Sequence, residues 1–290
     1  DLSNNTAIGH AVLAGAGGNR SNNTAIGSGA MYFDTTGSNN VALGVDALRN
    51  NTTANYNIGI GYRSLGYNSA AITGGENIGI GFAALHNITS GAINIAIGNY
   101  ALQALTTGSY NTALGYQSLN ANTTYSENTA VGYQALFYNT NNDNTAVGYQ
   151  SLYANTNGYY NTALGAYAGR STTTGISNTA IGTSALNSNV TSNSNTAVGF
   201  QAGYYATGGE HTFIGRLAGF NVTTGTANTF VGNPAGYLVT TGSKNTILGA
   251  FSGNQGGLDI RTANNYIVLS DGDGNPKWRS EEHTSELQSR

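Results

Sequence analysis

Few residues of this chain have the types and spacing that metal binding requires. The stretch Asp271-Gly-Asp-Gly-Asn275 places side-chain oxygens at alternate positions, as a calcium-binding loop does. Glu282 stands at the twelfth position of that loop, but Pro276 occupies a position that needs glycine. We therefore expect an ordinary turn between two strands here, and no metal site.

Residues that could carry catalysis are equally sparse. No pair of carboxylates recurs on neighbouring repeats, as cleavage of a glycoside by two acids would need. The four histidines are scattered, and none has a serine or carboxylate beside it in a recurring motif: His10, His86, His211 and His283. We expect no enzymatic activity and no cofactor.

The aromatic residues are more regular than the ionisable ones. Six of them directly follow a repeated glycine: Tyr62, Phe82, Tyr116, Tyr133, Tyr149 and Phe200. In a stacked repeat fold these rings would form a partial aromatic column. We favour packing between repeats or between chains as its role, and a platform for stacking glycan rings is the alternative.

The repeated glycine defines the architecture. It occurs fifteen times between Gly9 and Gly249, and ten of the fourteen intervals are 17 residues, the others being 16, 16, 18 and 20. A period this short is typical of a solenoid, in which each unit buries its apolar face only by stacking on its neighbours. The chain is therefore predicted to be all-β, a parallel β-solenoid (β-roll). Each coil would hold two short strands and two turns.

Fixed residue types precede each glycine. Ile, Leu or Val stands one residue before it in all fifteen repeats, Ala two before it in ten, and Thr three before it in eleven. Side chains alternate across a strand, so the Ala column and the branched column face opposite sides, and both are apolar. One coil is too small to bury both. We infer that alanine packs inside the roll and the branched residues pack against another chain, which predicts a homo-oligomer.

Asparagine stands four residues before the glycine in fourteen of the fifteen repeats. Stacked amides can hydrogen-bond from coil to coil and satisfy backbone groups at a corner. The glycine would take a backbone conformation closed to other residues or allow a close approach. The structural anchors of three successive repeats are then Asn111, Gly115, Asn128, Gly132, Asn144 and Gly148.

Composition excludes several partners. The net charge is −3 and only 8% of residues are charged, so there is no basic field for nucleic acid. There is no cysteine, which excludes disulfides and thiolate metal sites. No apolar run approaches the roughly 20 residues that cross a bilayer, so we expect no membrane insertion. The chain starts inside a repeat, at Asp1, and we expect the natural N-terminus to be missing.

The repeat motif Asn-Thr-Ala-(Ile/Val/Leu)-Gly-x-x-(Ala/Ser), as in NTAVGYQAL (128–136), resembles the head repeats of trimeric autotransporter adhesins, which are a few residues shorter. It is also similar to the repeat regions of phage tail fibres and related surface proteins. The segment NNYIVLSDGDGNP (264–276) resembles the stretch that precedes a C-terminal self-cleaving chaperone domain in such proteins. The resemblance covers nearly all of residues 1–278. It implies a trimeric, fibrous, surface-exposed protein.

Three parts are expected along the chain: a β-roll repeat domain (1–255), a closing β segment (256–278) and a non-native tail (279–290). The tail contains RSEEHTSELQS, which fits no repeat and looks like a translated sequencing adapter. It is left out of the fold prediction.

We expect an extracellular homotrimer on a cell surface or virion, a structural or adhesive fibre that presents multivalent contacts to a glycan or protein receptor. One alternative is ice binding by the threonine column, although four successive repeats replace threonine with Val41, Ile58, Ile78 and Ile95. Another is a purely structural, glycosylated fibril, with glycans on sequons such as those of Asn50, Asn87 and Asn221.

Overall fold

The computed structural model of the chain describes residues 4–16, 18–67 and 70–280, and these contain strands and turns but no α-helix. The chain divides into two compact units, Asp1–Tyr160 and Asn161–Arg290. Both are built from coils of about 17 residues, so the predicted parallel β-solenoid of about fifteen turns is confirmed. The expected boundary after residue 255 stays a prediction, and Glu282 and His283 lie outside the described residues.

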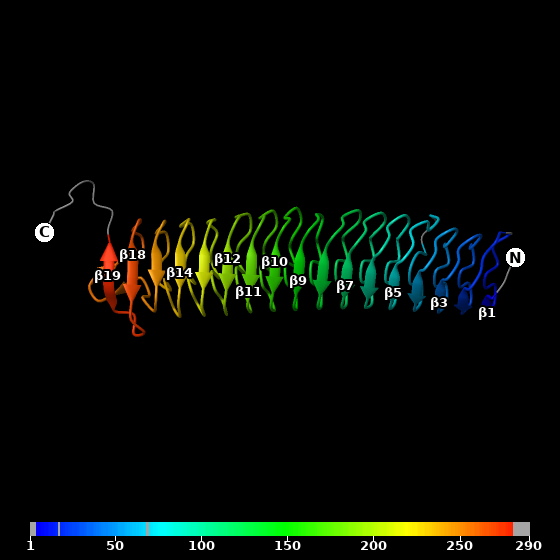
Figure 1. Cartoon of the computed structure of the whole chain (residues 1–290), viewed down its shortest axis with the longest axis horizontal. Helices are drawn as coiled ribbons and strands as arrows, with labels where there is room; N and C mark the ends of the chain where they lie inside the picture. Colours follow the sequence, from blue (N-terminus) through cyan, green and yellow to red (C-terminus); the bar gives the residue numbers. More distant parts are fainter. Residues whose placement is uncertain (1–3, 17, 68–69, 281–290) are drawn as a thin grey trace. The chain divides into compact units, whose positions relative to one another are not determined.

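The first unit holds nine three-residue strands that pair in parallel and in register, each with the next along the chain (Figure 1). They are β1 (Thr6–Ile8), β2 (Thr24–Ile26), β3 (Val41–Leu43), β4 (Ile58–Ile60), β5 (Ile78–Ile80), β6 (Ile95–Ile97), β7 (Thr112–Leu114), β8 (Thr129–Val131) and β9 (Thr145–Val147). Equal positions of successive repeats therefore stack on one another, which turns each column of the sequence into a row on the molecule.

The second unit continues the same pattern with β10 (Thr162–Leu164), β11 (Thr179–Ile181), β12 (Thr196–Val198), β13 (Thr212–Ile214), β14 (Thr229–Val231) and β15 (Thr246–Leu248). β18 (Ile267–Ser270) pairs in parallel with β15 and adds a further coil. β19 (Pro276–Ser280) turns back antiparallel against β18. Between β15 and β18 the chain forms a small antiparallel hairpin of β16 (Asn254–Gln255) and β17 (Leu258–Asp259).

Among the described residues, each coil from β1 to β14 has a single strand, so the expected second strand is wrong. In the coil of Gly115, Tyr110, Gln117 and Leu119 all have left-handed backbones, with φ of 61, 54 and 49°. Such residues turn the chain where an extended strand would run straight. Hydrogen bonds between coils continue outside the strand, for example from Leu119 N to Ala135 O at 3.1 Å, and these stabilise the turned backbone.

Gly115 shows why glycine ends the strand. Its φ is 137°, and the fifteen glycines of this column all have φ between 112 and 141°. A Cβ atom on Gly115 would lie 2.4 Å from the carbonyl oxygen of Gly132 in the next coil. Both the backbone angle and the close approach exclude other residues, as the sequence predicted.

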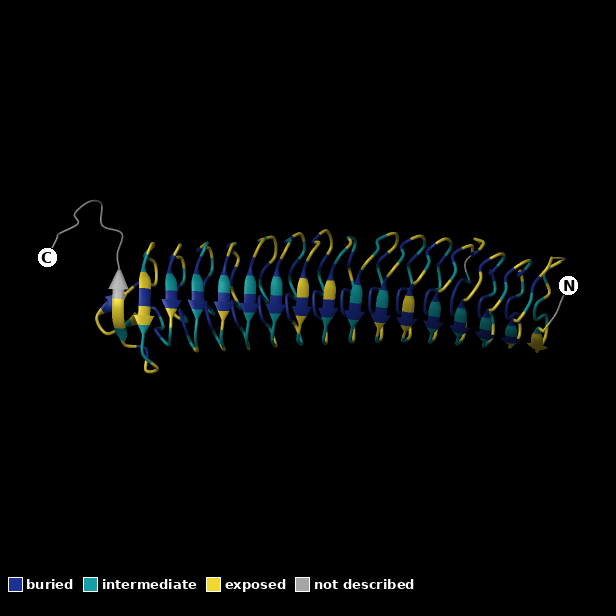
Figure 2. Cartoon of the chain, viewed as in Figure 1, coloured by how far each residue is buried: buried dark blue, intermediate teal, exposed yellow. Residues whose placement is uncertain are grey.

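The core lies inside each coil. From β2 to β15 the middle residue of every strand is buried while its two neighbours are partly or largely exposed, as the dark centres of the arrows show (Figure 2). Ala113 is fully buried, for example, and Leu114 is 44% exposed. The predicted alternation of an inner alanine column and an outer branched column is confirmed.

In the second unit, two coils replace the inner alanine with phenylalanine. Phe213 and Phe230 are fully buried, and each coil has glycine, Gly219 or Gly236, where most other coils have leucine. A Cβ atom on Gly219 would lie 2.5 Å from the Phe213 ring, and one on Gly236 would lie 2.3 Å from the Phe230 ring. The large ring therefore fills the volume that leucine fills elsewhere, and the interior stays close-packed.

Candidate functional site: the outer face and its columns

The outer face is the row of first and third residues of strands β1 to β15. Its third position is always Ile, Leu or Val, and several of these side chains are largely exposed: Ile8, Ile26, Ile97, Leu114, Leu164, Ile214 and Leu248. Branched apolar residues stacked coil upon coil form a continuous strip within each unit. Contiguous exposed apolar strips of this kind are typical of interaction surfaces.

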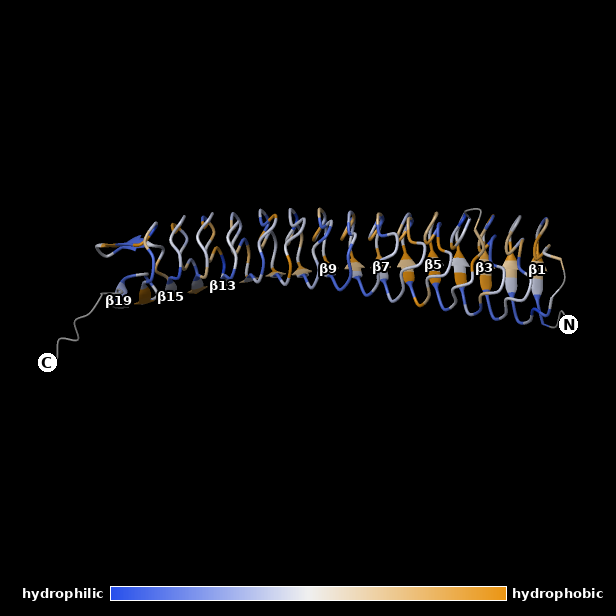
Figure 3. Cartoon of the chain, turned by 90° about the horizontal axis from the view of Figure 1, so that it is seen from above, coloured by the Kyte–Doolittle hydropathy of each residue, from blue (hydrophilic) through white to orange (hydrophobic). Residues whose placement is uncertain are grey.

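The first position of the outer face differs between the units. In the second unit all six strands from β10 to β15 begin with threonine. In the first unit Val41, Ile58, Ile78 and Ile95 replace threonine on β3 to β6, and the strands around β3 and β5 are drawn in orange in Figure 3. The outer face is therefore more apolar in the middle of the first unit, while its hydroxyl row is uninterrupted in the second.

The asparagine column lies inside the coil and works as the sequence predicted. Asn111 and Asn128 are fully buried, and the backbone N–H of Asn128 donates to Oδ1 of Asn111 at 3.1 Å. Asn128 Nδ2 donates to the same oxygen at 3.3 Å and to the carbonyl of Asn141 at 2.9 Å. Asn144 repeats the backbone contact with Asn128 at 3.1 Å. Each amide thus links one coil to the next and satisfies corner groups that are out of reach of water.

His211 takes the place of asparagine in this column. Its backbone N–H donates to Asn195 Oδ1 at 3.0 Å, and its Nδ1 accepts from the backbone N–H of Asn228 at 3.2 Å. Burial lowers the pKa of this imidazole to about 4, against the opposing effect of its backbone hydrogen bonds. The ring is therefore neutral and structural, as a corner position predicts. His10 is exposed, and His86 Nδ1 lies 2.9 Å from Asn87 Oδ1.

Five of the six predicted column aromatics come together in the first unit. Tyr116, Tyr133 and Tyr149 stack face to face, with ring centroids 5.4 and 5.1 Å apart and interplanar angles of 11 and 6°. Tyr62 and Phe82 stack at 5.4 Å and 19°. These five rings are 39 to 44% exposed, so they form an outward row.

Tyr100 belongs to this row although its spacing did not predict it, and the predicted member Phe200 lies apart from the row. Tyr100 follows its glycine by two residues rather than one, yet its ring contacts Phe82 at 5.1 Å and Tyr116 at 6.1 Å, edge-on in both cases. Phe200 lies in the second unit, where Thr183 and Arg216 hold the equivalent positions of the neighbouring coils. The link through Tyr100 depends on side-chain reach, which the spacing from glycine does not encode.

The suspected calcium loop is a turn between β18 and β19, as expected. Asp271 Oδ1 accepts hydrogen bonds from the backbone N–H groups of Asp273 at 3.1 Å and Asn275 at 2.8 Å. Lys277 Nζ lies 2.9 Å from Asp271 Oδ2. The hydrogen bond from Lys277, followed by that from Asn275, lowers the pKa of Asp271 to about 2. Both carboxylate oxygens are thus occupied by the turn itself.

One pair of carboxylates on neighbouring coils was missed. Glu127 and Asp143 each stand five residues before their glycine, and a hydrogen bond between them, together with the charge of Asp143, raises the pKa of Glu127. The shared column position was the signal that could have found them. Glu127 is exposed and Asp143 is half-buried, and no group of three or more metal-ligating residues occurs among the described residues.

The buried acid Asp34 was also missed. It lies seven residues after Gly27, fully buried, where Asn51 Nδ2 donates to its Oδ1 at 2.9 Å. Its other oxygen, Oδ2, has no hydrogen-bond partner. Nearby, the guanidinium of Arg20 donates to backbone carbonyls, including that of Asp34 at 2.5 Å. This is a structural site, because Asp34 and Asn51 are fully buried and Arg20 is only 8% exposed.

The asparagines of all three sequons are engaged by the fold, and Asn87 Oδ1 lies 2.9 Å from His86 Nδ1. Asn50 is only 7% exposed, and Asn221 Nδ2 donates to the carbonyl of Tyr237 at 2.8 Å.

Comparison with known proteins returned no match to a family model, to a curated protein or to a solved structure. Among the residues that the structure describes, no helix has the length and apolarity to cross a bilayer.

Proposed function

We propose that this chain is a structural and adhesive fibre of a cell surface or virion, in which outer faces of separate chains pack together as a homotrimer. The observation that supports this proposal is the outer face itself, with a branched apolar residue on every coil. Water-exposed Ile, Leu and Val at each step leave a large apolar surface that association would bury. The number three comes from the resemblance to trimeric adhesins.

In such an assembly the repeat supplies length and stiffness, and binding strength comes from presenting several weak contacts at once. The aromatic row of the first unit serves mainly to stack coil on coil, because Tyr116, Tyr133 and Tyr149 cover much of one another.

A charged substitution on the outer face tests the proposal. Ile181 lies at the third position of β11, and Ile181→Asp would place a carboxylate in the buried interface at a large desolvation cost. The matched control is Thr191→Asp, which puts the same charge on an exposed residue of the same coil, away from the strand. By native mass spectrometry, we expect Ile181→Asp to lose the trimer and Thr191→Asp to keep it.

Circular dichroism would show that both variants retain the β-solenoid, because Ile181 points away from the core. An Ile181→Asp trimer with an unchanged melting temperature would contradict the proposal.

A second candidate function is ice binding, and the uninterrupted threonine row of β10 to β15 favours it. Six hydroxyls in register, about 4.8 Å apart, form a regular array that could order water. Thermal hysteresis of the chain would support this candidate. If thermal hysteresis is absent and the chain has a trimeric mass, the results favour the structural and adhesive fibre over ice binding. A glycosylated structural fibril would instead show added mass on the sequon asparagines.

A further inference from the structure

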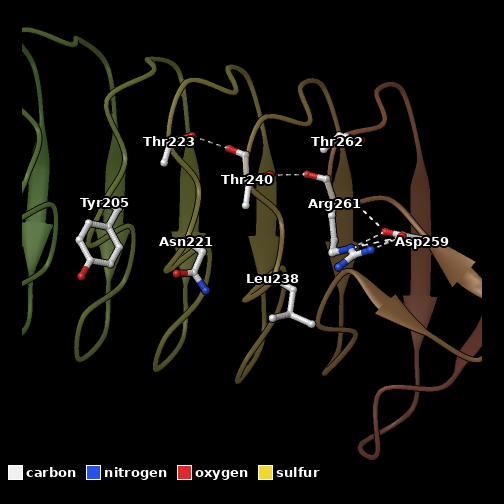
Figure 4. Close-up of a pocket in the computed structure, with 8 residues that line it drawn as sticks. All are labelled: Tyr205, Asn221, Thr223, Leu238, Thr240, Asp259, Arg261 and Thr262. Carbon is white, nitrogen blue, oxygen red and sulfur yellow. Dashed lines mark hydrogen bonds and ion pairs between the residues drawn. The ribbon is translucent and has the colours of Figure 1, made fainter.

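The second unit has a groove of about 510 Å³ on the turn side of its coils, separate from the outer face and from the aromatic row. Tyr205, Asn221 and Leu238, from three successive coils, lie along it, and Arg261 and Asp259 stand at one end (Figure 4). This volume is in the range of small-ligand sites in proteins.

The apolar side of the groove is held rigid by stacked rings. Tyr205 is 45% exposed and packs edge-on against Tyr204 and Phe220, with centroids 4.7 and 5.2 Å away and interplanar angles of 78 and 79°. Tyr204, Phe220 and Tyr237 stack face to face at 5.4 Å each. The Tyr205 ring is therefore fixed in an exposed position, so the protein would lose little side-chain entropy when a ligand stacks against this ring.

The end of the groove carries a matched ion pair. Arg261 Nη2 lies 2.7 Å from Asp259 Oδ2, and Arg261 Nε lies 2.9 Å from Asp259 Oδ1. Both side chains are about half exposed. The pair has no net charge, yet Arg261 retains further N–H donors and the carboxylate retains lone pairs.

Hydrogen-bond acceptors line the middle of the groove. Asn221 Nδ2 is engaged by the carbonyl of Tyr237, which leaves its Oδ1 to accept. The hydroxyls of Thr223 and Thr240 donate to the carbonyls of the next coil, both at 3.2 Å, so their oxygens also remain acceptors.

We propose that this groove binds a neutral oligosaccharide of about three sugar rings lying along the coil axis. Sugar rings offer an apolar face for Tyr205 and Leu238, and hydroxyls that both donate and accept for Asn221, Asp259 and Arg261. The neutral ion pair disfavours an anionic ligand. From the coil of Tyr205 to that of Arg261 there are three coil steps, about 14 Å in all.

The proposal names the ligand class for the adhesive part of the proposed function and does not depend on self-association. Its test is an array of neutral and acidic oligosaccharides probed with the full chain, followed by titration calorimetry of the trisaccharides that bind. We expect neutral trisaccharides to bind. Tyr205→Ala and Arg261→Ala should each weaken them about tenfold or more.

Tyr138→Ala is the matched control. Tyr138 holds the same column position in the first unit, is also 45% exposed, and packs edge-on against Phe137 and Tyr153 at 4.6 and 5.2 Å. This variant removes the same ring from an equivalent cluster and should leave affinity unchanged.

Three results would overturn the proposal. Either no oligosaccharide binds, or only acidic oligosaccharides bind, or the Tyr205→Ala and Arg261→Ala variants both bind neutral trisaccharides as tightly as the parent chain. The mass of each sample separates the two claims. A trimer that binds no sugar overturns the groove alone, and a sugar-binding single chain overturns the self-association alone.

Discussion

Asp34 offers a sharp test of how the coil interior is stabilised. Five other coils of the described residues place asparagine at its position, seven residues after the glycine, and in each of them that amide donates to a nearby backbone carbonyl. Asn51 donates to the carbonyl of Ala54 at 3.1 Å and Asn122 to that of Tyr125 at 3.1 Å. An ionised aspartate cannot donate, and Oδ2 of Asp34 has no hydrogen-bond partner. Asp34→Asn would supply the side-chain donor that these five coils have.

The size of the effect follows from the pKa of Asp34. Burial raises this pKa from 3.8 to about 6, opposed by the hydrogen bond from Asn51, the charge of Arg20 and the N–H of Gly37. Between pH 3.8 and 6 the folded state binds the proton more tightly than the unfolded chain, so stability is lost as pH rises through this window. At 1.36 kcal/mol per pKa unit, ionised Asp34 costs about 3 kcal/mol above pH 6.

We therefore expect Asp34→Asn to stabilise the first unit by about 3 kcal/mol at pH 8 and by little at pH 4. Urea denaturation at the two pH values measures the free energy of unfolding, and hydrogen exchange over residues 18–54 localises the change. The converse variant, Asn122→Asp, should be destabilised more at pH 8 than at pH 4. Equal stabilities of Asp34→Asn and the parent chain at pH 8 would refute the argument.

Two further predictions concern the second unit. The pKa of His211 is lowered by burial from 6.5 to about 4, so its neutral form stabilises the fold above pH 6.5 and that stability is lost as pH falls toward 4. Urea denaturation should show that His211→Asn removes about 3 kcal/mol of this acid sensitivity, and an unchanged pH profile would contradict it. Phe213→Ala should cost about 3–5 kcal/mol, and Gly219→Leu should also destabilise because its Cβ would lie 2.5 Å from the ring. The double variant recreates the Ala180 and Leu186 pairing of another coil. Thermal denaturation should therefore show a loss of stability well below the sum of the two single losses. Additive losses would contradict the idea that the phenylalanine ring occupies the volume of the missing leucine.

Much of the coil could be predicted because its columns are direct physical constraints. The alternation of side chains along a strand places Ala113 inside the coil and Leu114 outside it. The close approach to Gly132 requires glycine at 115, and the coil corner requires the hydrogen-bonding groups of Asn128. These features depend on the repeat alone.

The remaining features depend on contacts between coils that no single repeat encodes. Gln117 and Leu119 have no intrinsic preference for a left-handed backbone, so a second strand was expected where the coil-to-coil hydrogen bonds impose a turn. The groove beside Tyr205 was not predicted, because Asp259 lies at the end of a hairpin outside the repeat pattern and Arg261 follows directly after that hairpin.

The central claim, that the outer face is covered by other copies of the chain, is tested most directly by the solution mass of the chain from light scattering. We predict a mass three times that of one chain. A single-chain mass at every concentration measured would contradict the claim, because the branched row from Ile8 to Leu248 would then face water.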